Sequence, residues 1–81
     1  MPKVRRKAVP PAVIEHLARR IRERHVPIED LQSFARWLDT NPTVPSGLWF
    51  KRFVRIVVCG EDDLVKTFLE DKHTAIGVEV E

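Results

Sequence analysis

Aromatic and cationic side chains alternate along residues 49–55. In an extended strand, Trp49, Lys51, Phe53 and Arg55 would lie on one face, because successive side chains point to opposite sides of a strand. Aromatic rings stack on nucleic-acid bases, and lysine and arginine bind phosphates. The pattern therefore predicts a single-stranded nucleic-acid platform. Its alternative is a structural face, in which the two rings belong to the core and the cations extend to solvent.

A second basic set precedes this stretch. Arg19 and Arg20 begin a run of four arginines within six residues, and arginines carried on a helix can follow a phosphate backbone. We therefore add Arg19 and Arg20 to the predicted nucleic-acid contacts. The alternative is a solvated helix face, partly neutralised by Glu15 and Glu23.

Metal and cofactor chemistry is not indicated. The three histidines and the single cysteine do not have zinc-ligand spacing, and no glycine-rich phosphate loop is present. We expect no metal and no cofactor. A lone cysteine, Cys59, cannot form an intrachain disulfide, which is typical of a reducing cytoplasm.

Two amphipathic helices are predicted in the first half. Residues Ile14, Leu17, Ala18 and Ile21 repeat at helical spacing from Pro10-Pro11 to near His25. A second helix begins at Pro27, has an apolar stripe that includes Leu31, Phe34 and Leu38, and ends at Asn41-Pro42. The short link between them predicts a helical hairpin.

The second half is predicted to form a sheet. Residues 49–59 are rich in β-branched and aromatic side chains, residues 64–69 follow an acidic turn, and residues 76–80 alternate between apolar and other residues. Residues 47–57 also fit a helical stripe, so a helix there is the alternative.

The combined prediction is a single α+β domain. A flexible basic arm, residues 1–9, precedes residues 10–81, in which the helical hairpin packs on a three-stranded antiparallel β-meander. No apolar run approaches the roughly 18 residues of a membrane-spanning helix, so no membrane association is expected. Residues 1–25 carry a net charge of +6 and residues 26–81 a net charge of −4, which predicts an electric dipole.

We expect a small non-enzymatic binding module that contacts a macromolecule, either protein or nucleic acid. The order of two helices and a basic antiparallel sheet also resembles the small ribonuclease toxins of the RelE and ParE type. That resemblance implies catalytic residues on the sheet and its strand ends, at Arg52, Arg55, Lys66, Thr67 and His73. A third hypothesis is a dimerising element, in which the strand at 76–80 offers its edge to a second copy.

Overall fold

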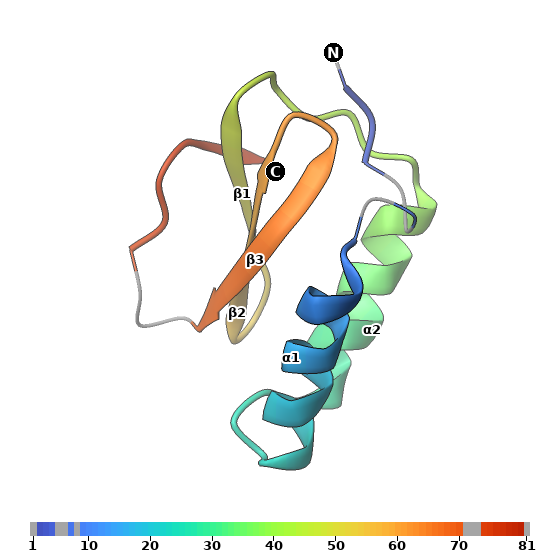
Figure 1. The fold of residues 1–81 in the computed structure, drawn as a ribbon, viewed down its shortest axis with the longest axis vertical. Helices are drawn as coiled ribbons and strands as arrows, with labels where there is room; N and C mark the ends of the chain where they lie inside the picture. Colours follow the sequence, from blue (N-terminus) through green and yellow to red (C-terminus); the bar gives the residue numbers. More distant parts are fainter. Residues whose placement is uncertain (1, 5–6, 8, 71–73, 81) are drawn as a thin grey trace.

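The computed structural model describes residues 2–4, 7, 9–70 and 74–80 and has two layers. Helices α1 (Pro11–Arg22) and α2 (Ile28–Asp39) lie on one face of a four-stranded sheet (Figure 1). The predicted α+β class, with a helical hairpin packed on a sheet, is therefore confirmed. In the described residues, neither helix is long and apolar enough to span a bilayer.

The helices begin at prolines, as predicted. Pro10 and Pro27 occupy the N-cap positions with φ near the value that the proline ring imposes, and Glu29 and Asp30 lie in the first turn of α2. The chain leaves α1 through Arg24, whose φ of 63° is left-handed. The N–H groups of His25 and Val26 both donate to the Arg20 carbonyl and close the end of the helix.

The sheet is mixed and has four strands. Strands β1 (Leu48–Arg52), β2 (Ile56–Glu61) and β3 (Leu64–Glu70) form an antiparallel meander, and β4 (Val78–Val80) pairs with β1 in parallel, in the order β3-β2-β1-β4. The fourth strand arises because residues 49–59 form two strands rather than one. A turn at residues 53–56 separates them and is closed by a hydrogen bond from the Phe53 N–H to the Ile56 carbonyl. The alternative of a helix at 47–57 is wrong.

The position of β4 also differs from the predicted meander. The chain crosses from β3, at one edge of the sheet, to β4, at the other, and residues 74–77, the described part of this connection, lie on the side of the sheet away from the helices (Figure 1). Of the connection, Thr74 and Ile76 line a hollow on that outer face with Leu48, Cys59 and Thr67. A strand that returned directly to β3 would have been antiparallel, whereas the crossover produces a parallel pair with β1.

The core lies between the helices and the inner face of the sheet. Its buried side chains are Val4, Val9, Leu17, Val26, Phe34, Leu38, Val44, Trp49, Ile56, Val58, Val65 and Phe68. Val4 and Val9 belong to the segment that we predicted to be a flexible arm. The Val4 N–H donates to the Pro42 carbonyl and the Val44 N–H to the Pro2 carbonyl, so residues 2–4 are part of the folded domain.

Candidate nucleic-acid interface

Of the two rings of the predicted platform, Trp49 lies in the core and Phe53 packs against it. Trp49 is 0% exposed, and its indole N–H donates to the Asp62 carbonyl at 2.8 Å. Phe53 is half-buried, with ring centroids 5.9 Å from Phe34 and 6.3 Å from Trp37 of α2. Neither ring is therefore placed to stack on a base, and the structural alternative describes this face of β1.

The cations of the same stretch separate from one another. Lys51 is half-buried on the inner face and lies 5.9 Å above the Phe53 ring. Arg52 is on the outer face, over the Phe50 ring and 3.8 Å from the carboxylate of Glu79. Only Arg55 lies in the turn between β1 and β2, where its side chain is exposed.

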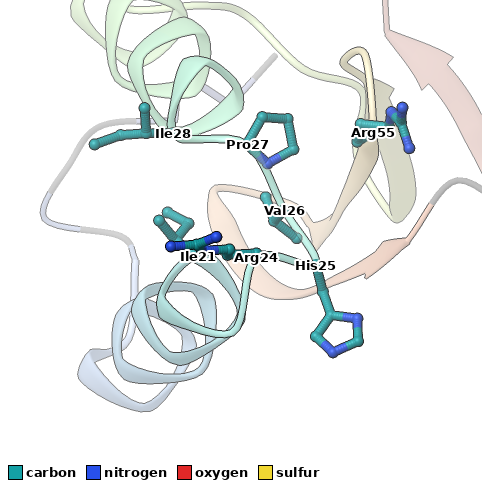
Figure 2. A pocket seen from close by; sticks show the side chains of 7 residues that line it. All are labelled: Ile21, Arg24, His25, Val26, Pro27, Ile28 and Arg55. Carbon is teal, nitrogen blue, oxygen red and sulfur yellow. The ribbon is translucent and has the colours of Figure 1, made fainter.

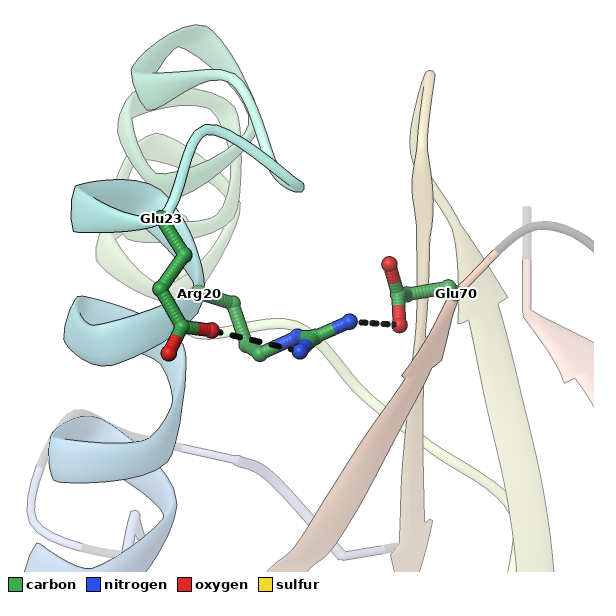
Figure 3. Close-up of polar contacts among 3 residues, drawn as sticks. All are labelled: Arg20, Glu23 and Glu70. Carbon is green, nitrogen blue, oxygen red and sulfur yellow. Dashed lines mark hydrogen bonds and ion pairs between the residues drawn. The ribbon is translucent and has the colours of Figure 1, made fainter.

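The Arg20 side chain forms ion pairs within the protein and is not an unpaired surface cation. Its guanidinium lies between two carboxylates, 2.6 Å from Glu70 of β3 and 3.3 Å from Glu23, the residue that follows α1 (Figure 3). Its charge is thus compensated within the protein, and it joins α1 to the edge of the sheet. The neighbouring Arg19 is exposed, and its role as a nucleic-acid contact stays a prediction.

The residues implied by the ribonuclease resemblance do not form one cluster. Arg52 and Thr67 share the outer face, with β2 between their strands. Lys66 lies near the β2–β3 turn and pairs with Glu61 at 3.8 Å, whereas Arg55 is at the other end of β2. His73 lies outside the described residues.

A hollow of about 420 Å³ lies where the α1–α2 connection meets the β1–β2 turn, and it is lined by Ile21, Arg24, His25, Val26, Pro27, Ile28 and Arg55. We call this end of the molecule the basic end, defined by Arg24, His25 and Arg55. All three side chains are exposed, and within the described part of the chain none forms an ion pair or a side-chain hydrogen bond. Figure 2 shows them fanning outward in different directions around the connection.

The backbone fixes where each of these side chains starts. The left-handed Arg24 donates its N–H to the Ile21 carbonyl at 3.0 Å, and the buried Val26 fastens the connection to the core. On the other side of the hollow, the Arg55 N–H donates to the Asp30 carboxylate at 2.7 Å. Arg24 belongs to the run of four arginines that the sequence placed on the first helix, whereas His25 was not predicted as a site residue. The sequence did not show that the β1–β2 turn lies beside them.

The exposed charged side chains differ between the two ends of the long axis. The basic end lies at one end of the long axis, and the β2–β3 turn with Glu61, Asp62 and Asp63 lies at the other (Figure 1). Glu29 is exposed near the basic end, but Glu23 and Glu70 are held by Arg20. The N-terminal residues 2–4, which include the exposed Lys3, lie toward the same end as this acidic turn, so the charge asymmetry of the sequence does not become a simple end-to-end dipole in space (Figure 1).

Other chemistry has little support in the described residues. They contain no group of three histidine, cysteine or carboxylate side chains that could hold a metal ion. Burial raises the pKa of the Cys59 thiol, which disfavours the reactive thiolate.

In comparisons with known proteins, no family model, no curated protein and no solved structure matches this chain. Any function must therefore be argued from the geometry above.

Proposed function

We propose that the protein is a nucleic-acid-binding module that contacts the phosphate backbone with its basic end. The observation that carries the proposal is the outward fan of Arg24, His25 and Arg55 around the hollow, without intramolecular partners among the described residues. Arginine side chains without intramolecular partners attract polyanions, and their contacts with phosphates release counterions from the nucleic acid.

The divergence of the side chains favours an extended polyanion over a small phosphorylated ligand. A single phosphate would need the cations to converge on one point, whereas these point apart (Figure 2). Successive phosphates of a strand are separated by several ångströms and suit separate contacts. Because Trp49 is buried and Phe53 packs on α2, we expect little base stacking and therefore weak sequence preference.

The proposal is tested by fluorescence anisotropy with labelled single-stranded RNA, single-stranded DNA and duplex DNA. For two arginine–phosphate contacts to a single strand, from Arg24 and Arg55, we expect log Kd to change with log salt concentration with a slope of about 1.4. Arg24→Ala and Arg55→Ala should each lower that slope by about 0.7, with similar effects on all sequences.

Arg36→Ala is the matched control. Arg36 is an exposed arginine in the last turn of α2, far along the helix from the basic end, and its replacement should leave the slope unchanged. Absence of binding to all three probes at low salt would exclude the proposal. It would leave an acidic protein surface as the partner that the same cations fit.

A further inference from the structure

Asp30 is the one buried charged side chain among the residues that the structure describes. It lies in the first turn of α2 and is 1% exposed. Its Oδ2 accepts the hydrogen bond from the Arg55 N–H, while Oδ1 is buried and has no hydrogen-bond partner in the described structure. No described cation pairs with it.

Stability alone does not account for this carboxylate. Burying a charge without a cationic partner is costly, and an unsatisfied buried oxygen adds to that cost. A favourable interaction with the dipole of α2 needs no burial, because the exposed Glu29 provides it from the preceding position. What Asp30 does, and Glu29 does not, is to hold the β1–β2 turn.

The turn is held at two points. The Phe53 ring packs on Phe34 and Trp37 at its start, and Asp30 binds the backbone of Arg55 near its end. Between them Val54 is 76% exposed. Without the Asp30 contact, Phe53 and the buried Ile56 would still fix the two ends of the turn, but the Arg55 backbone would lose its hydrogen bond to α2 beside the α1–α2 connection.

We infer that Asp30 is a positioning residue for nucleic-acid binding, which holds Arg55 on the side of the hollow opposite Arg24. This inference rests on the proposed function, because it assigns to Asp30 a share of the same binding. Pre-ordering an arginine lowers the conformational entropy that binding would otherwise cost.

A double-mutant cycle tests this role. Asp30→Ala should weaken binding of single-stranded RNA by about twofold to tenfold, the factor that corresponds to ordering one side chain. In an Arg55→Ala background the same substitution should have no further effect. Asp30→Asn keeps an oxygen acceptor for the Arg55 N–H and should bind at least as tightly as the wild type, and Val54→Ala, a change in the same turn, is the matched control.

The direction of the effect separates positioning from electrostatics. Removing a negative charge near cations would by itself tighten binding of a polyanion, so a merely electrostatic role predicts tighter binding for both Asp30→Ala and Asp30→Asn. Tighter binding by Asp30→Ala, or an equal loss in both Arg55 backgrounds, would overturn the inference and leave the proposed function intact. If the wild-type protein binds no nucleic acid, the proposed function fails, and the role of Asp30 fails with it.

Hydrogen exchange tests the anchor without any variant, which matters if Asp30→Ala does not fold. The Arg55 amide of the wild-type protein should be protected by its bond to Asp30, while the exposed Val54 amide, which has no described acceptor, exchanges faster. Equal and unprotected exchange at both amides would overturn the inference regardless of the binding results.

Discussion

Arg24 adopts a backbone conformation that its side chain disfavours. It occupies the position after α1 where glycine is usual, with φ of 63°, and the other described non-glycine residues with positive φ are Asn41 and Asp62. Asparagine and aspartate tolerate this region better than arginine does. A strained arginine at the basic end is consistent with retention for its charge rather than for stability.

Arg24→Gly should therefore separate stability from binding. We expect the free energy of unfolding in urea to rise by about 0.5–1 kcal/mol, because glycine enters the left-handed region without strain, while nucleic-acid affinity falls. Arg22→Gly is the control: the same chemical change inside the last turn of α1 should destabilise the protein by about 1 kcal/mol. Destabilisation by both substitutions would contradict the argument.

Cys59 gives a pH dependence with a definite sign. Burial raises the pKa of its thiol in the folded protein, so the unfolded chain ionises at lower pH than the native state does. The contribution of the neutral Cys59 thiol to stability is complete below the pKa of the unfolded chain. It is lost as pH rises through the pKa of the folded protein. Urea unfolding at about pH 7 and about pH 9.5 should show a larger decline in the wild type than in Cys59→Ala. Equal declines would argue against this cause.

At the scale of elements, the Arg20–Glu70 ion pair connects the two layers. It joins α1 to the end of β3, with the two side chains 26% and 33% exposed, at a distance of 2.6 Å. Glu70→Gln should lower the free energy of unfolding by about 1 kcal/mol, and added salt should reduce the difference. Glu61→Gln, which breaks the more exposed 3.8 Å pair with Lys66, should change stability by less than about 0.5 kcal/mol. Equal effects of the two substitutions would show that the short pair has no special role.

The helices could be predicted from the sequence because their signals are local. Prolines mark both starts, and the spacing of Leu17 with Ile21 or of Phe34 with Leu38 identifies the buried stripes. The β1–β2 turn could not be found in this way. No glycine or proline marks it, and Val54 and Ile56 favour strands, so the run appears continuous although Val54 is at the exposed tip.

The candidate site was harder to predict than the fold, for a related reason. The sequence shows that Trp49 and Phe53 would share a face, but which face meets the helices is decided by tertiary packing. The juxtaposition of Arg24 with Arg55 likewise depends on how the hairpin docks on α2 through Asp30. Such long-range contacts have no signature in residue spacing.

At the scale of the whole molecule, the sheet contains one pair that is remote in sequence. Residues 53–77, 25 in number, separate β1 from β4, and β4 contributes only three residues to the sheet. Pairing β4 with β1 costs more loop-closure entropy than the other strand pairs do and forms fewer hydrogen bonds. We therefore expect β4 to be the least stable strand of the sheet. In hydrogen exchange we expect the amides of residues 78–80 that donate within the sheet to exchange faster than the paired amides of β2, which has a neighbour on each side. Equal protection would show instead that the sheet opens only as a unit.

The parallel pairing of β4 also has a consequence in time. A folding chain can assemble α1, α2 and the meander before β4 arrives, and in that interval one edge of β1 has no strand beside it. An open edge accepts any extended segment, including the β4 of another molecule. Detachment of β4 from β1 in the folded protein would allow two molecules to exchange their β4 strands. Concentrated samples would then form domain-swapped dimers, held by the same β1–β4 pairing as in the monomer.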